Sequence, residues 1–249
     1  MQIIGHRGAR GEAPENTLSG FNHLKSLGIR AVEFDIRVSH DGQLVVIHDD
    51  SVERTTNGIG LVHQKTINEL AALDACSHFN SWPHHDGVPS LAAVLTCLAD
   101  FDHLQLEVKV TTPQDCAIVA QQLPLLCQTF GSRAVTTSFN LDYLRLIQQT
   151  APHITRGLLV EDDFKGDIID LAQSLGCKLI APHHQLLHLD LVQQAHQQGL
   201  VVSTWTVNQA QRMIDLQNMG LDSLITDYPS LALKTLAQDG FRSSTHPTN

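Results

Sequence analysis

Short apolar segments alternate with longer segments of helical periodicity along almost the whole chain, and few folds accommodate this pattern. We predict strands at residues 2–5, 31–38, 103–110, 134–139, 155–160, 178–181, 200–207 and 222–226. We predict helices at residues 17–27, 90–99, 113–126, 141–149, 166–175, 189–198 and 208–219, and a last short helix from about residue 229. Eight strands, each followed by a helix, make up the repeat of a parallel α/β barrel.

The predicted fold class is therefore α/β, a TIM (β/α)8 barrel with a small insertion after the second strand. The alternative is an open, doubly wound parallel sheet. Such a sheet usually carries a G-x-G-x-x-G phosphate-binding loop after an early strand, and this sequence has none.

One interval breaks the regular spacing, because about 65 residues separate the second and third barrel strands. An Asp41-Gly42 turn there predicts a hairpin that returns through residues 44–47. The following residues, about 51–88, are rich in turn signals, and we expect them to form an insertion beside the barrel mouth. We predict one domain over residues 1–241 and a disordered tail at residues 242–249.

Charge and composition exclude several classes of partner. The net charge of −10 argues against a protein that binds the phosphate backbone of nucleic acids. No run of eighteen apolar residues is present, so we predict no membrane insertion. The N-terminus has no secretory signal pattern, and the five cysteines are odd in number with no C-x-x-C pair. We expect a cytoplasmic protein with reduced thiols.

Acidic side chains occupy the polar face of two predicted strands. Glu33 and Asp35 alternate with apolar residues on the second strand, and Glu107 and Lys109 do so on the third. The apolar face of a barrel strand meets the helices, so we expect the carboxylates to point towards the axis. Three converging carboxylates would hold a hard cation, Mg²⁺ or Ca²⁺. An ordinary Glu107–Lys109 ion pair is the alternative.

Two histidines lie at predicted strand ends. His6-Arg7 follows the first strand, and His48 follows the return of the hairpin. Barrel enzymes carry their reactive groups at such positions, so these imidazoles would supply an acid–base pair. The alternative for His6-Arg7 is a surface turn with a solvated arginine. The alternative for His48 is that it is one more of the fifteen histidines, without a catalytic role.

Other polar or aromatic residues also stand near strand ends, with functional and structural interpretations about equally open. Trp205 would line the mouth and pack against the apolar part of a ligand. The remaining members of this group are Ser138, His183, His184 and Asp227.

Several motifs, taken together and in order, resemble the glycerophosphodiester phosphodiesterase family, in particular its bacterial cytoplasmic members. They are HRGARGEAPENT (6–17), EFDIRVSHDG (33–42), VVIHDDSVERTTNGIG (45–60), VPSL (88–91), LEVK (106–109), SF (138–139), WTVN (205–208) and ITDYP (225–229). The resemblance covers residues 3 to about 230. It departs at Ala92 and Ala93, where many members carry glutamates.

The resemblance implies roles for individual residues. It implies catalysis by His6 and His48, a divalent cation, Mg²⁺ or Ca²⁺, held by Glu33, Asp35 and Glu107, and phosphate contacts from Arg7 and Lys109. It implies hydrolysis of small glycerophosphodiesters, such as glycerophosphocholine or glycerophosphoethanolamine, to sn-glycerol 3-phosphate and the free alcohol. Four points stay open: which alcohol is preferred, which histidine is the acid and which the base, whether water attacks the diester directly or a cyclic phosphate forms first, and the oligomeric state.

Two rival functions remain. A phospholipase D-like lyase that acts on membrane lipids could use a similar barrel. Such an enzyme would be expected to carry a secretion signal and disulfides, and the sequence predicts neither. A degenerate barrel that only binds ligands would usually have lost a reactive group. Here both histidines, all three carboxylates, Arg7 and Lys109 are retained.

Overall fold

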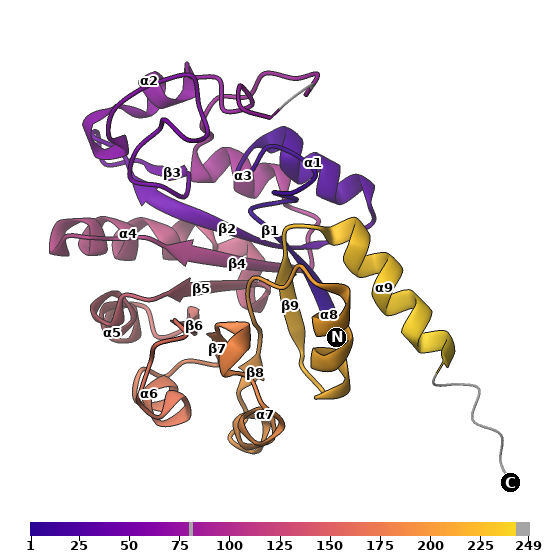
Figure 1. Ribbon diagram of the computed structural model, residues 1–249. Coiled ribbons are helices and arrows are strands. Elements are labelled where there is room, and N and C mark those ends of the chain that lie inside the picture. The colour runs from indigo at the N-terminus through magenta and orange to yellow at the C-terminus, as the bar shows by residue number, and fades with distance from the viewer. Residues whose placement is uncertain (80–81, 243–249) are drawn as a thin grey trace, which may run out of the picture.

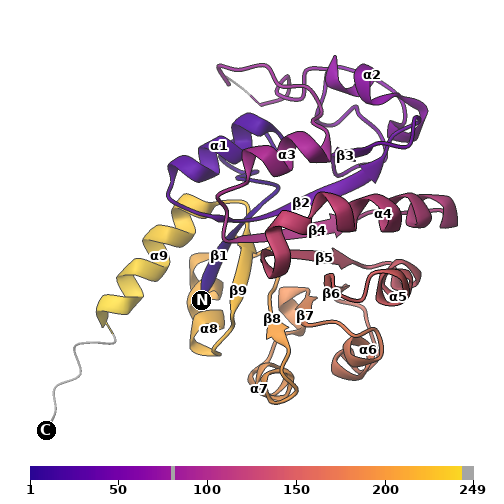
Figure 2. The same cartoon turned by 180° about the vertical axis from the view of Figure 1, so that it is seen from behind.

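The barrel predicted from the sequence is present in the computed structural model, which describes residues 1–79 and 82–242. Eight parallel strands form a nearly closed barrel, surrounded by helices (Figures 1 and 2). These strands are β1 (Gln2–His6), β2 (Ala31–Val38), β4 (His103–Val108), β5 (Ala134–Ser138), β6 (Thr155–Val160), β7 (Leu179–Pro182), β8 (Val201–Val202) and β9 (Ser223–Thr226). Their order is β8-β7-β6-β5-β4-β2-β1-β9.

Strand β8 is much shorter than the predicted segment 200–207. The strand next to it, β7, ends at Pro182, which has no N–H group to donate to a ladder. Two carbonyl oxygens of β7 also accept hydrogen bonds from side chains. Thr204 Oγ1 donates to Pro182 O (2.7 Å), and Trp205 Nε1 donates to Ala181 O (2.8 Å). The barrel closes here through single backbone bonds, such as Ile225 N to Thr204 O at 2.8 Å.

The helices lie on the outside of the barrel and mostly match their predicted ranges (Figure 2). They are α1 (Leu18–Ser26), α3 (Leu91–Cys97), α4 (Pro113–Leu126), α5 (Leu141–Thr150), α6 (Ile168–Ser174), α7 (Leu189–Gln197), α8 (Ala210–Asn218) and α9 (Pro229–Arg242). Short 3₁₀ segments precede β5 and α7, at Gln128–Arg133 and His184–Leu186. Side chains of Thr17, Ser90, Thr112 and Asn140 cap helix N-termini, as expected for these residue types.

The C-terminal helix differs from the prediction. We expected a short helix and a tail beginning at residue 242, but α9 continues to Arg242. The remainder of the predicted tail, residues 243–249, lies outside the described residues.

The segment between β2 and β4 begins with the predicted hairpin. Strand β3 (Leu44–Val46) pairs antiparallel with β2, and Val45 forms a further bridge to Ser90. A 3₁₀ turn (Val62–Gln64) and α2 (Ile67–Ala71) follow, with a small apolar core of their own that includes Val52 and Leu70. Both views show this segment beyond β2 and β3 at one side of the barrel.

Alternation along β2 and β4 determines where the polar residues go. Phe34 packs edge-on against Phe21 of α1, with ring centroids 5.8 Å apart. The neighbouring residues Glu33 and Asp35 therefore point to the barrel axis. In the register between the two strands, the Cα atoms of Asp35 and Glu107 are partners. Nothing in the described part of the chain is a helix long and apolar enough to cross a bilayer.

A buried histidine at the opposite end of β4 predicts pH-dependent stability. His103 Nε2 is buried and has no hydrogen-bond partner among the described residues, and burial lowers its pKa from 6.5 to about 4. Between these values only the unfolded chain takes up the proton, so stability falls as the pH falls through 6.5. From about pH 7.5 to about pH 5.5 we expect the wild type to lose about 1 kcal/mol more unfolding free energy than His103→Gln. Urea unfolding of both proteins at the two pH values measures this difference, and equal losses would contradict it.

Candidate active site

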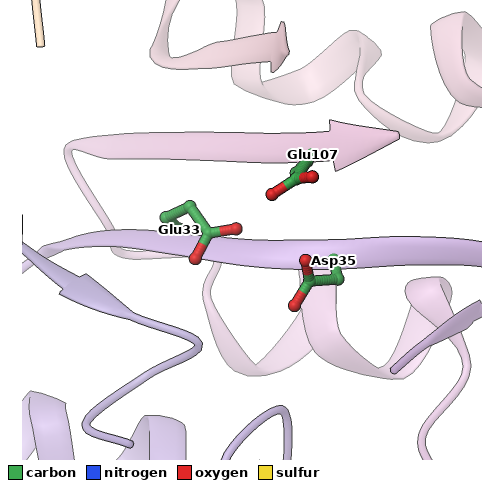
Figure 3. Close-up of side chains that lie close together, drawn as sticks. All are labelled: Glu33, Asp35 and Glu107. Atoms are coloured by element: carbon green, nitrogen blue, oxygen red, sulfur yellow. The ribbon is translucent and has the colours of Figure 1, made fainter. Parts of the chain in front are cut away.

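Three carboxylates converge at the axis of the barrel (Figure 3). Glu33, Asp35 and Glu107 each contribute an oxygen that lies within 4.8 Å of the other two. The side chain of Asp35 is fully buried, and those of Glu33 and Glu107 are 5% and 13% exposed. Two of the buried oxygens, Glu33 Oε1 and Asp35 Oδ1, have no hydrogen-bond partner among the described residues.

The ionisation of these groups reflects their crowding. Burial, together with the neighbouring charges of Asp35 and Glu107, raises the pKa of Glu33 well above its usual range. Burial and the charge of Asp35 raise the pKa of Glu107 to about 7. Burial alone would raise the pKa of Asp35 as well, but the charges of Lys109 and Arg7 keep it below its usual value. An acidic triad in which Glu33 Oε1 and Asp35 Oδ1 accept no hydrogen bond from the described residues fits a divalent cation, which would favour the charged form of all three groups.

The two cations predicted to contact phosphate lie beside this triad. Lys109 Nζ bonds to Glu107 Oε1 and lies 3.4 Å from Asp35 Oδ1. The guanidinium of Arg7 lies 3.2 Å from Asp35 and donates to Glu15 Oε1 at 2.8 Å. Arg7 adopts a left-handed backbone conformation (φ 51°), and its N–H donates to Glu33 Oε2 at 3.1 Å. The predicted Glu107–Lys109 ion pair is therefore real, and it lies within the carboxylate site.

His6 ends β1 and is held by a residue of β9's loop. Its Nδ1 lies 2.6 Å from Asp227 Oδ1, and its Nε2 lies 3.8 Å from Glu33 Oε2. Burial lowers the pKa of His6 and outweighs the hydrogen bond to Asp227, which raises it. The ring is therefore oriented so that one nitrogen faces its aspartate and the other faces the carboxylate triad.

His48 is held in the same way at the end of the hairpin. Its Nδ1 lies 2.6 Å from Asp49 Oδ1. Its backbone carbonyl accepts a hydrogen bond from Arg37 Nε at 2.7 Å, which ties the loop to β2. Burial lowers the pKa of His48, although the charge of Asp35 raises it. With a side chain 29% exposed, against 10% for His6, His48 is the more accessible of the two imidazoles.

Both histidines line one cavity of about 200 Å³. The other predicted site residues that line it are Arg7, Glu33, Glu107, Lys109 and Trp205. Trp205 and Phe139 form an aromatic wall, with edge-to-face rings whose centroids lie 5.5 Å apart. A second, wider groove of about 670 Å³ begins on the other side of Lys109 and is lined by Arg37 and by Thr112 at the start of α4.

The other residues considered at strand ends separate into two groups. Ser138 is buried and donates to Val108 O at 2.7 Å, and His183 packs edge-on against Trp205; neither side chain lines the cavity. Asp227 belongs to the site because it holds His6. Its position directly after the last strand, within the ITDYP motif, marked it in the sequence, but nothing local links it to His6, which lies 221 positions away.

The chain resembles known proteins over nearly its full length. A model of the glycerophosphoryl diester phosphodiesterase family matches residues 6–231. A Bacillus subtilis relative named as a putative glycerophosphodiester phosphodiesterase is 33% identical, with 94% of this chain and 97% of the relative covered.

Solved structures agree with this similarity. A putative glycerophosphoryl diester phosphodiesterase from Silicibacter pomeroyi superposes with a TM-score of 0.88 at 28% identity, covering 96% of this chain and 94% of that one. A phosphodiesterase from Oleispira antarctica, in complex with the product sn-glycerol-3-phosphate, superposes with a TM-score of 0.86 at 27% identity, covering 95% and 97%.

Proposed function

This chain belongs to the glycerophosphoryl diester phosphodiesterase family and is a glycerophosphodiester phosphodiesterase, and from this premise we propose its substrates, its metal requirement and its catalytic groups. The substrates are small glycerophosphodiesters such as glycerophosphocholine and glycerophosphoethanolamine, and the products are sn-glycerol 3-phosphate and the free alcohol. The observation that supports this most is one cavity lined by two aspartate-held imidazoles and by Glu33 and Glu107 of the carboxylate triad.

A divalent cation, Mg²⁺ or Ca²⁺, completes the site in this proposal, and Glu33, Asp35 and Glu107 hold it. The cation supplies positive charge where the phosphate gathers negative charge. Arg7 and Lys109 lie beside the triad and line the same cavity, so they add donors for the phosphate oxygens. Trp205 and Phe139 supply apolar surface for the carbon atoms of the substrate.

The two imidazoles move the protons. We assign His6 as the base that takes a proton from the nucleophile, because its ring is the deeper of the two. We assign His48 as the acid that protonates the leaving alkoxide, because its greater exposure places it nearer to the path by which an alcohol leaves. The nucleophile is water, or the 2-hydroxyl group of the glycerol, which expels the alcohol and forms a cyclic phosphate. Water must then open this ring to give sn-glycerol 3-phosphate, with His48 taking the proton from water and His6 returning one to the 2-oxygen.

Proton transfer alone does not supply the full rate enhancement. A general acid and a general base each give about 10²–10⁴-fold, which is together at most about 11 kcal/mol. Enzymes lower the barriers of slow reactions by up to about 23 kcal/mol or more. The remainder is assigned to positioning and to the charges that surround the phosphate.

The proposal also covers the domain organisation, the cellular location and the partners of the chain. We propose a single catalytic domain over residues 1–241 with the insertion at about 51–88. We propose a cytoplasmic location, because all five cysteines are free thiols. The partner is a small-molecule diester, and neither nucleic acid nor membrane insertion is involved.

The proposed activity has a direct test. Purified protein with Mg²⁺ or Ca²⁺ should release sn-glycerol 3-phosphate from glycerophosphocholine, and a coupled glycerol-3-phosphate dehydrogenase reads this release. Choline should appear in equal amount. A cyclic phosphate as the final product would favour the lyase, and no turnover of either glycerophosphodiester would favour a barrel that only binds ligands.

A further inference from the structure

Glu15, a largely buried residue that does not line the cavity, bonds to three arginines that each contact an aspartate of the site. Glu15 follows the β1 loop, and its side chain is 9% exposed. Its carboxylate accepts four hydrogen bonds, two from Arg54 (both 2.8 Å), one from Arg7 (2.8 Å) and one from Arg10 (3.0 Å). Burial would raise the pKa of Glu15, but the bonds from Arg54 and the charge of Arg7 keep it far below its usual value.

Each arginine leads to a different part of the site. Arg54, in the segment after the hairpin, also donates to Asp49, the aspartate that holds His48. Arg10 Nη1 lies 3.6 Å from Oδ2 of Asp227, the aspartate that holds His6. The third arginine, Arg7, lies 3.2 Å from Asp35 of the carboxylate triad.

We propose that Glu15 is the positioning residue that fixes the orientation of the two imidazole rings relative to each other and to the carboxylate triad. It acts through Arg54 on His48 and through Arg10 on His6, and it touches no substrate. Its role in turnover rests on the function proposed above, whereas its effect on the two rings does not.

Glu15 can hold the three arginines because their hydrogen bonds to its carboxylate are charge-assisted and largely shielded from water. A carboxylate can accept four hydrogen bonds, whereas the amide of glutamine has one oxygen and presents two donors at its other end. Glu15→Gln keeps the shape but leaves three guanidinium groups around an uncharged residue. Those groups repel one another, and the aspartates that they contact shift with them.

Selective labelling of the histidine rings gives the decisive measurement. With the His6 and His48 signals assigned from the alanine variants, Glu15→Gln should move both signals. Arg54→Gln should move the His48 signal and spare that of His6, and Arg10→Gln should do the reverse. The matched control is Glu12→Gln, since Glu12 lies on the same loop but bonds to Ser230. It should move neither signal.

Kinetics give the second measurement. Small displacements of reacting groups cost up to about 10²-fold in turnover. We expect Glu15→Gln to lower kcat by about that factor and to change KM by less than about threefold, while Glu12→Gln keeps both values.

Two results would overturn the proposal. One is unmoved imidazole signals in folded Glu15→Gln, and the other is a normal kcat with a loss only in KM. If Glu15→Gln fails to fold, the two arginine variants decide, and unmoved or indiscriminate ring signals in them would overturn it. If the wild type hydrolyses no glycerophosphodiester, the proposed function fails, but the ring signals still decide whether Glu15 positions the imidazoles.

Discussion

Replacement of His6 or His48 by alanine lowers kcat for glycerophosphocholine by about 10²–10⁴-fold in each case, because each variant removes one of the two groups that transfer protons. We expect KM to change little, since neither imidazole is assigned to ground-state binding. The double variant should lose less than the product of the two single losses, because groups that act as a unit are not additive. Steady-state release of sn-glycerol 3-phosphate measures all three proteins.

A histidine outside the site provides the matched control. His153 is exposed between α5 and β6, and His153→Ala should keep wild-type turnover. The urea midpoints of all variants should stay close to that of the wild type, which separates lost chemistry from lost folding. Near-normal rates in both His6→Ala and His48→Ala would reject the proton-transfer roles.

Removal of divalent cations by EDTA abolishes turnover, and added Mg²⁺ or Ca²⁺ restores it. Without a cation, the site lacks the positive charge that would stabilise the negative charge gathering on the phosphate. Turnover after dialysis against EDTA, followed by titration with each ion, measures the effect. Full activity after exhaustive chelation would remove the metal from the mechanism.

Binding of the ion can be followed without turnover. Isothermal titration calorimetry of the wild type with Mg²⁺ or Ca²⁺ should show one site, and Asp35→Asn should abolish it because Asp35 is the most buried of the three groups. Asp142→Asn is the control, since Asp142 is 88% exposed on α5. Unchanged binding heats in Asp35→Asn would place the ion elsewhere.

Local patterns were sufficient to predict most of the barrel and part of the site. Alternation along β2 and β4 predicted the inward direction of Glu33, Asp35 and Glu107, because successive side chains of a strand point to opposite faces. Helix α4 was predicted to the residue, and a threonine cap followed by proline marks its start. The positions of His6 and His48 at strand ends were equally evident from the sequence.

Other features depend on which segments meet in space. Strand β8 stops at Val202 because side chains and a proline change the hydrogen bonding of β7, and no pattern within residues 200–207 indicates this. The β2–β3 hairpin brings His48 into the cavity that Glu33 and Glu107 line, whereas its local sequence pattern singled it out without showing this proximity.

Sequence alone therefore determined the fold class and the strand faces, because these follow from periods of two and 3.6 residues in local segments. Strand-end positions and the motif resemblance identified the candidate residues. Only the tertiary structure decided which partners hold those residues. Asp227 reaches His6 across 221 positions, and Arg54 reaches Glu15 across 39. Contacts of this kind arise when the barrel closes and the insertion folds against it, so no local period carries them.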